Sequence, residues 1–135
     1  MATFTKFNCF TEDVAEKVHN LGSDQLKVAL TNSAPAAGNT VLANITEVSY
    51  ANVSTRNITT STSAQTSGTY KLVLADLTLT ATGAVGPFRY VVVYNDTATG
   101  DPLIAYYDYG SNVTLAASDT FVIDFDPTNG FLQIT

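Results

Sequence analysis

The chain has 135 residues with a net charge of −6, and 45% of its residues are hydrophobic while only 13% are charged. That length predicts one domain, residues 1–135, with enough chain to bury a hydrophobic core. The six basic residues are scattered, whereas binding to nucleic-acid phosphates or to an anionic membrane surface needs clustered Lys and Arg. Nucleic acid and membranes are therefore not expected as partners.

The single cysteine, Cys9, cannot form a disulfide within the chain. The first residues also lack the charged and then apolar segments of a signal peptide, and no apolar stretch approaches transmembrane length. We therefore expect the protein to be made and folded in a cytosol.

The N-terminal segment, residues 1–10, is apolar and carries Phe4 and Phe7. A chain end of this kind forms either a strand of a sheet or an arm that reaches a neighbouring subunit. Both alternatives make Phe4 and Phe7 candidate contact residues.

The one predicted helix covers residues 11–21. Its first turn is acidic, which suits the helix dipole, and Gly22 provides a stop. Val14, Val18 and Leu21 are expected to share one face. About two turns are too few to be stable alone, so this helix is expected to dock on a larger β structure.

From residue 25 onward the pattern predicts strands. Threonine recurs throughout, and its branched Cβ suits a pleated sheet. The expected strands, in chain order, are 26–30, a looser one at 40–50, an edge strand or exposed loop at 56–62, then 70–74, 77–81, 88–94, 103–109, 113–115, 120–125 and 131–134.

Three local features refine this prediction. Apolar parity slips by one residue near Ala75-Asp76, which predicts a β-bulge. The nearly continuous apolar run 88–94 predicts a central strand buried on both faces, and the turn at 126–130 predicts that the last two strands form a hairpin. The pattern favours an all-β protein, an antiparallel β-sandwich with a jelly roll as the leading topology and one short N-terminal helix.

Residues suited to catalysis or to zinc binding are scarce. His19 is the only histidine and Cys9 the only cysteine, so zinc lacks ligands and nothing local supports a nucleophile–base pair. His19 is expected to interact with the helix end, and Cys9 to act as a small buried hydrophobic residue. No catalytic residue, metal, cofactor or small-molecule substrate is predicted, and the chain is not expected to be an enzyme.

Four aspartates near the C-terminal strands keep calcium binding as an alternative. Asp108, Asp119, Asp124 and Asp126 could lie at related sheet ends, but calcium needs six or more oxygen ligands and no EF-hand spacing is present. The same carboxylates could form a glycosidase pair, although the chain has no Trp to support a sugar ring. A solvated face, or protection against edge pairing, is the favoured interpretation.

A tyrosine-rich strand is the clearest sign of binding. Tyr106, Tyr107 and Tyr109 place aromatic side chains on both faces of one strand, and tyrosine is common at protein interfaces. We expect at least one of Tyr106 and Tyr107 to point outward. Together with Phe4 and Phe7, these tyrosines are the predicted interface residues.

Three blocks of the sequence resemble a family of small structural proteins of tailed bacteriophages. The blocks are residues 13–21 with 26–35, residues 65–72, and residues 86–96 continuing into 102–111. The resemblance spans nearly the whole chain, and members are often encoded near the major capsid protein.

The resemblance implies a virion component, and the expectation is a decoration or cement protein on the outer surface of the capsid. Its partners would be the major capsid protein and copies of itself, as a dimer or a trimer. The family carries no catalytic motif, so no functional residue is transferred from it. The alternative is a carbohydrate-binding or receptor-binding β-module of a tail or fibre.

Overall fold

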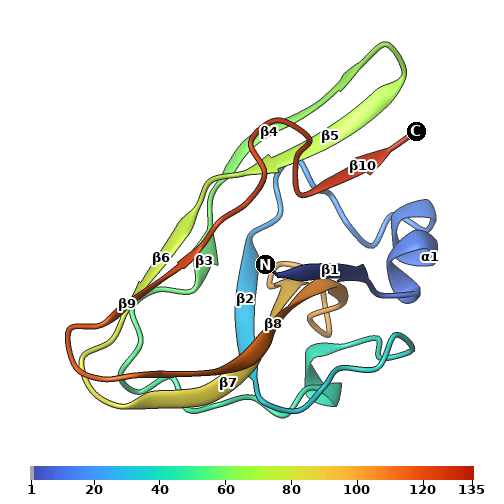
Figure 1. Ribbon diagram of the computed structural model, residues 1–135. Helices are drawn as coiled ribbons and strands as arrows, with labels where there is room; N and C mark the ends of the chain where they lie inside the picture. The colour runs from blue at the N-terminus through green and yellow to red at the C-terminus, as the bar shows by residue number, and fades with distance from the viewer. Residues whose placement is uncertain (1) are drawn as a thin grey trace.

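A computed structural model describes residues 2–135 and shows a protein built from antiparallel β-sheets, as the composition predicts (Figure 1). One sheet has five strands in the order β1-β8-β7-β2-β3, a second has three in the order β10-β5-β4, and a third pairs β6 with β9. The elements are β1 (Thr3–Lys6), α1 (Cys9–Ala15), β2 (Leu26–Thr31), the 3-10 helix η1 (Leu42–Asn44), β3 (Asn57–Ile58), β4 (Thr60–Thr66), β5 (Thr69–Leu74), β6 (Leu77–Thr80), β7 (Val85–Asn95), β8 (Leu103–Leu115), β9 (Thr120–Ile123) and β10 (Leu132–Ile134).

Strand β7 lies at the centre of the five-stranded sheet, between β8 and β2. Val91 and Val93 belong to the main hydrophobic core, whereas Val92 and Tyr94 belong to a smaller cluster on the opposite face. The three valines have no exposed surface. The prediction of a central strand buried on both faces is therefore confirmed.

The main core is shared by all three sheets. Phe88 of β7, Leu72 of β5, Leu79 of β6 and Ile123 of β9 all lie in it and are fully buried. The smaller cluster is covered by the long connection between β2 and β3, which contributes Ile45.

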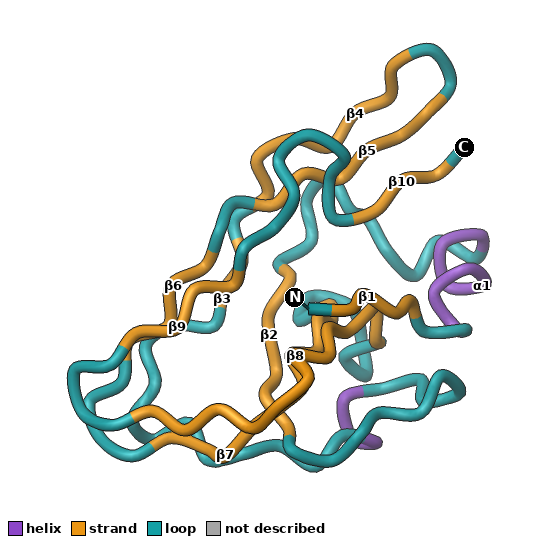
Figure 2. The backbone as a smooth tube through the Cα atoms, viewed as in Figure 1, coloured by secondary structure: helices purple, strands orange, loops and turns teal. Residues whose placement is uncertain are grey.

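The prediction of a strand at residues 40–50 is wrong. This part of the β2–β3 connection is irregular, with η1 and one isolated bridge between Val41 and Pro102 (Figure 2). The Asn44 side chain accepts hydrogen bonds from the backbone N–H groups of Thr40 and Val41, at 3.0 and 3.2 Å. A side chain that bonds to nearby backbone competes with strand pairing, so the segment turns instead.

The prediction of a β-bulge at Ala75-Asp76 is also wrong. The parity slip marks the place where the chain leaves the three-stranded sheet after β5 and enters the two-stranded sheet at β6. Asp76 fixes this crossing, because its Oδ1 accepts the backbone N–H of Phe125 at 2.9 Å.

The last two strands do not form a hairpin with each other. β9 pairs with β6, and β10 pairs with β5. The predicted turn is present, with Asp126 Oδ1 accepting the N–H groups of Thr128 and Asn129. It carries the chain from one sheet to the other, so that β9 and β10 follow β6 and β5 in reverse order.

Helix α1 starts and ends earlier than the predicted range of 11–21. Lys17 adopts a φ of 66°, Lys17 N–H donates to Val14 O at 3.3 Å, and Val18 N–H donates to Asp13 O at 2.8 Å. This is a Schellman termination, and it occurs before Gly22. As a result Val18 is exposed while Leu21 is buried, so the expected shared face does not form.

The N-terminal segment forms a strand of its own chain's sheet. β1 pairs antiparallel with β8, with Phe4 opposite Tyr107 and Thr5 opposite Tyr106. The β4–β5 hairpin projects beyond the body (Figure 1). Within residues 2–135, no helix has the length and apolar character needed to cross a membrane.

Candidate functional site

Strand β8 places its tyrosines on two faces of the five-stranded sheet. Tyr106 packs against Phe7 and Tyr90, with ring centroids 5.2 and 6.3 Å apart. Tyr107 faces the other way and contacts Phe4 at 5.7 Å. Both tyrosines are half-buried, so each keeps some exposed surface on its own face of the sheet.

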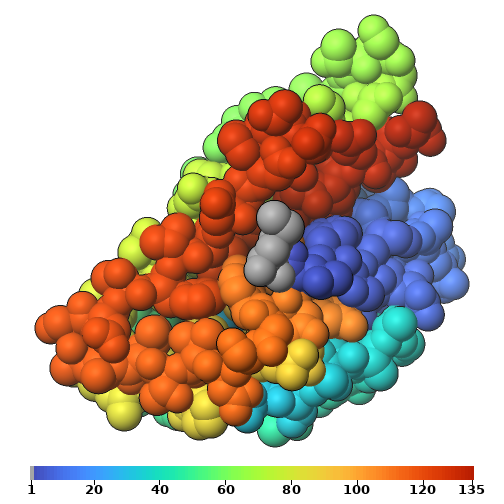
Figure 3. All heavy atoms as spheres, in the orientation of Figure 1, coloured from blue at the N-terminus to red at the C-terminus, as the bar shows by residue number. Residues whose placement is uncertain are grey.

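An exposed aromatic surface forms where β1, β8 and β9 meet. Phe4 is 40% exposed and Val122 is 50% exposed, and the half-buried Tyr107 and Tyr109 lie with them. We call Phe4, Tyr107, Tyr109 and Val122 the aromatic patch. On the face shown in Figure 3, the N-terminal segment, β8 and the segment that carries β9 lie next to one another.

The aromatic patch surrounds a shallow hollow of about 290 Å³. It is lined by Tyr107, Tyr109 and Val122, together with Ala2 and Asp124. The hollow therefore combines two aromatic rings, an aliphatic side chain and one negative charge.

Neighbouring aromatic rings, of which Phe125 and Phe131 are buried, pack against the patch. Tyr107 lies 6.2 Å from both Phe125 and Phe131, and Tyr109 meets Phe121 edge-on at 5.1 Å. Rings locked by such packing lose little conformational entropy on binding. The patch is thus prepared for contact before a partner arrives.

The patch hydroxyls stay neutral and free. Burial, with smaller contributions from Asp124 and neighbouring groups, raises the pKa of Tyr109 to about 12 and that of Tyr107 further above its ordinary range. Within residues 2–135 neither hydroxyl makes a hydrogen bond to another side chain or to the backbone. Each can therefore bond to water or to a partner.

The structure brings together only part of the predicted interface. Phe4, Tyr107 and Tyr109 gather in the aromatic patch, while Tyr106 lies on the opposite face. Phe7 was predicted as a contact residue, but it is 0% exposed and sits in the smaller cluster, so it has no surface to offer a partner.

Val122 is the patch residue that the sequence analysis did not select. Phe121 and Ile123 alternate with it along the strand, and this alternation puts Val122 on the opposite face from Ile123, which is buried. An apolar residue at an outward position is the sequence feature that could have marked Val122 as a contact residue, and Val122 is indeed 50% exposed.

Three of the four C-terminal aspartates, Asp108, Asp119 and Asp126, serve separate turns and pairs, while Asp124 lines the hollow of the aromatic patch. Asp108 pairs with Arg89, whose Nε donates at 2.8 Å, and Asp119 Oδ2 accepts the N–H of Ala116. Arg89 and the Gly110 N–H lower the pKa of Asp108, and turn N–H groups lower that of Asp126. Within residues 2–135, no three His, Cys, Asp or Glu side chains are grouped to hold a metal ion.

His19 is buried in a polar network instead of sitting at the helix end. Its Nδ1 lies 3.0 Å from Asn95 Nδ2, which also donates to Asp24 Oδ2 at 2.7 Å. Its Nε2 has no hydrogen-bond partner and lies 3.9 Å from Asp13 Oδ2. Burial lowers the pKa of His19, although Asp13 and Asp24 partly offset this effect.

Cys9 is partly exposed and does not share these contacts. Its Sγ lies 3.6 to 3.8 Å from the carbonyl oxygens of Leu103, Asn39 and Thr40. Burial, followed by the charge of Asp13, raises the pKa of the Cys9 thiol. A raised pKa lowers the thiolate fraction and so the reactivity.

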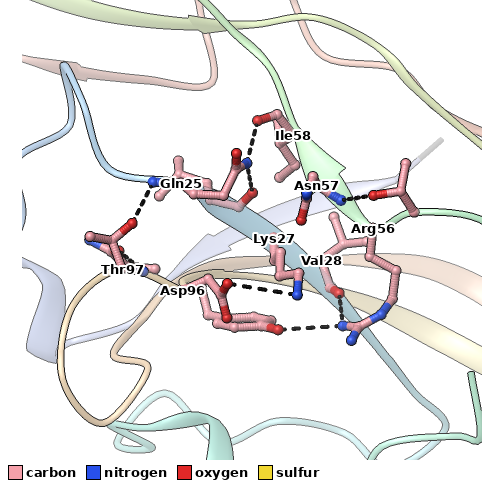
Figure 4. Close-up of polar contacts among 12 residues, drawn as sticks. Gln25, Lys27, Val28, Arg56, Asn57, Ile58, Asp96 and Thr97 are labelled. Carbon is pink, nitrogen blue, oxygen red and sulfur yellow. Dashed lines mark hydrogen bonds and ion pairs between the residues drawn. The ribbon is translucent and has the colours of Figure 1, made fainter.

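Two of the basic side chains tie strand β2 to neighbouring segments, Arg56 from just before β3 and Lys27 to the residue after β7 (Figure 4). Arg56 Nη1 donates to Val28 O at 2.7 Å, and its guanidinium lies 3.7 Å from the centre of the Tyr50 ring. Lys27 Nζ lies 3.7 Å from Asp96 Oδ2. These cations are already engaged in holding the sheet edge, which leaves the aromatic patch as the best candidate for a contact surface.

Comparison with models of protein families, with curated proteins and with solved structures gives no match for this chain.

Proposed function

We propose that this chain is a non-enzymatic structural protein of a tailed-phage virion, which binds the major capsid protein lattice from outside and stabilises the head. The sequence resemblance suggests the class of protein. The aromatic patch is the observation that carries the proposal, because it offers rigid apolar area with neutral polar tips.

The energetics of the patch suit a protein that binds in many copies. Fully burying one large apolar side chain contributes about 1.5–3 kcal/mol, so the exposed parts of Phe4 and Val122 contribute less than that at each contact. Such a contact is weak alone. Repeated over a symmetric shell by linked copies, it gives strong overall binding through effective concentration.

The finer architecture belongs to the same proposal. We infer a β-sandwich of the jelly-roll kind that assembles as a dimer or a trimer. Supporting this, the five-stranded sheet shares one hydrophobic core with the other two sheets. Free energy of binding to the shell would add to the stability of the head against internal pressure.

Co-sedimentation with capsids that lack this protein tests the proposal. Saturable binding at a fixed ratio per major capsid subunit is the expected result. Val122→Lys places a charge in the aromatic patch, and we expect it to weaken binding at least tenfold. Val18→Lys is the matched control, because Val18 is also an exposed valine but lies beyond helix α1. Capsids that do not bind the folded protein would overturn the proposal.

A glycan-binding module of a tail or fibre is the second candidate. The hollow lined by Tyr107, Tyr109 and Asp124 favours it, because aromatic faces pack on sugar rings and a carboxylate accepts their hydroxyl groups. A glycan array in the presence of calcium tests this candidate. Absence of any bound glycan would remove it.

A further inference from the structure

Strand β4 is an open sheet edge. It forms one margin of the three-stranded sheet and pairs only with β5. Within residues 2–135, no backbone hydrogen bond from another segment reaches Ser61 to Thr66 on the outer side. An edge strand of this kind presents a row of N–H and C=O groups that can pair with another strand.

The other edge strands are much shorter. β1, β3, β6, β9 and β10 each have four residues or fewer, whereas β4 has seven. A longer strand offers more hydrogen bonds in one register. Among the strands at the margins of the three sheets within residues 2–135, β4 is therefore the longest edge.

The usual protections against edge pairing are missing from most of β4. Proteins protect open edges with charged side chains, proline, bulges or a covering loop. The strand Thr60–Thr66 has neither a charged residue nor a proline, and its one irregularity in register lies at its start, between Thr60 and Thr62. The flanking charges, Arg56 and Lys71, lie outside it.

The shape of the molecule leaves this edge accessible. The β4–β5 hairpin projects from the body in both the ribbon and the space-filling views (Figures 1 and 3). Ser61, Thr62 and residues 64–66 are exposed. Gly22 lies against one face of this hairpin, where a Cβ on it would be 3.6 Å from Ser63 Oγ, so a second strand has to approach in the plane of the sheet, along the outer edge of β4.

We propose that β4 pairs antiparallel with β4 of a second copy of this chain, around a twofold axis at Ser63. That register pairs all seven residues and places Thr62 of one copy opposite Ala64 of the other. A twofold contact uses the same surface on both copies. The two three-stranded sheets then form one continuous sheet across the dimer.

The register favours a second copy as the occupant, because a twofold axis at Ser63 pairs the uncharged strand with itself. Each chain carries a net charge of −6, so two copies repel each other wherever charged surfaces meet. The uncharged edge of β4 brings the copies together without placing like charges opposite each other. The proposal goes beyond capsid decoration and does not depend on it.

The expected dimer is reversible. Stable interfaces bury about 1,200–2,000 Å² in total, and pairing of one seven-residue strand reaches only the low end of that range or less. We therefore expect a dimer that dissociates on dilution. Copies held side by side on a larger assembly would pair more completely, because their effective concentration is high.

Sedimentation velocity over a concentration series tests the inference with two matched variants. Thr62→Lys with Ala64→Lys places like charges opposite across the twofold axis, and we expect the dimer dissociation constant to rise at least tenfold. Thr62→Glu with Ala64→Lys keeps the same lysine beside Lys71 within the hairpin but places opposite charges across the axis. We expect this variant to dimerise at least as well as the unmodified protein.

Three results would overturn the inference. They are an unmodified protein that stays monomeric at millimolar concentration, a doubly lysine-substituted variant that dimerises normally, and a charge-paired variant that is as weak as the lysine pair. Circular dichroism checks that each variant is folded. A monomer that still binds capsids would refute β4 pairing alone, whereas a dimer that binds no capsid would refute decoration alone.

Discussion

Truncation of Asn95 tests the buried polar network around His19. Asn95 is 0% exposed and ends the central strand β7. Its Nδ2 contacts His19 Nδ1 and Asp24 Oδ2, and its Oδ1 accepts the N–H groups of Thr97 and Ala98 at 2.9 and 3.0 Å. One side chain thus ties the segment after helix α1 to the β7–β8 loop.

The expected cost of Asn95→Ala is about 2.5–6 kcal/mol, counted from these contacts. The hydrogen bond to charged Asp24 contributes about 1.5–3 kcal/mol, and leaving the buried His19 ring without a partner costs about 1–3 kcal/mol more. Thr97 and Ala98 lie at or near the surface, so water can replace the lost bonds to their N–H groups. A loss of this size lowers the Tm of a domain of this length by roughly 10 °C or more.

Urea unfolding followed by circular dichroism measures this cost. Asn112→Ala is the control, because Asn112 is exposed and makes no side-chain hydrogen bond, and we expect a change within about 0.5 kcal/mol. A cost below about 1 kcal/mol for Asn95→Ala would refute the reasoning, because it would mean that the buried contacts contribute no more than one ordinary hydrogen bond.

Two further predictions concern pH and backbone conformation. Burial lowers the pKa of His19 in the folded protein below its ordinary 6.5, so the unfolded chain binds the proton more tightly. The stability that neutral His19 provides is therefore complete above pH 6.5. It is lost as the pH falls below 6.5 towards the pKa of the folded protein. Urea unfolding from pH 7.5 to 5.0 should show this loss, His19→Gln should flatten it, and an equal slope in both proteins would contradict it. For Gly130→Ala we expect a larger loss of unfolding free energy than for Gly68→Ala in the same assay. Both glycines have φ above +80°, but a Cβ at Gly130 would lie 2.8 Å from Leu72 O, while Gly68 faces open space. Equal losses would show that this close approach does not matter.

The sequence was a good guide to burial along single strands. The near-continuous apolar run around Val91 to Val93 predicted a strand with two buried faces, because alternation is lost only when both faces lie in the core. The same alternation placed Tyr107 and Tyr109 on one face of β8. These features depend on neighbours in the chain, so they can be inferred from the sequence.

Pairing between distant segments could not be inferred in this way. Phe4 joins the aromatic patch only because β1 pairs with β8 in a register that sets it opposite Tyr107. Phe7, three residues on, lies beyond the end of β1 and enters the smaller cluster. Local alternation gives no register between strands a hundred residues apart, so the sequence could not tell that Phe4 would stay exposed while Phe7 would be buried.

Helix α1 and the final strands show a different limit. Lys17 ends the helix in a left-handed conformation, although glycine is the residue that favours this position and Gly22 is available later. The turn at Asp126 formed as expected, yet it connects two sheets instead of two paired strands. In both cases tertiary packing decided between conformations that the local sequence permits.

The aromatic patch and the outer edge of β4 have no residue in common, and this separation makes the two proposals one testable mechanism. If the patch binds the lattice while β4 joins copies, each dimer binds at two points, and linkage of two weak contacts strengthens overall binding by about 10²–10⁴-fold. Thr62→Lys with Ala64→Lys should then weaken capsid binding without touching the patch, while Val122→Lys should weaken it and leave the dimer intact. Equal capsid binding by the monomeric and dimeric forms would show that the copies bind independently, and β4 pairing would then have no part in the attachment of this protein to the shell.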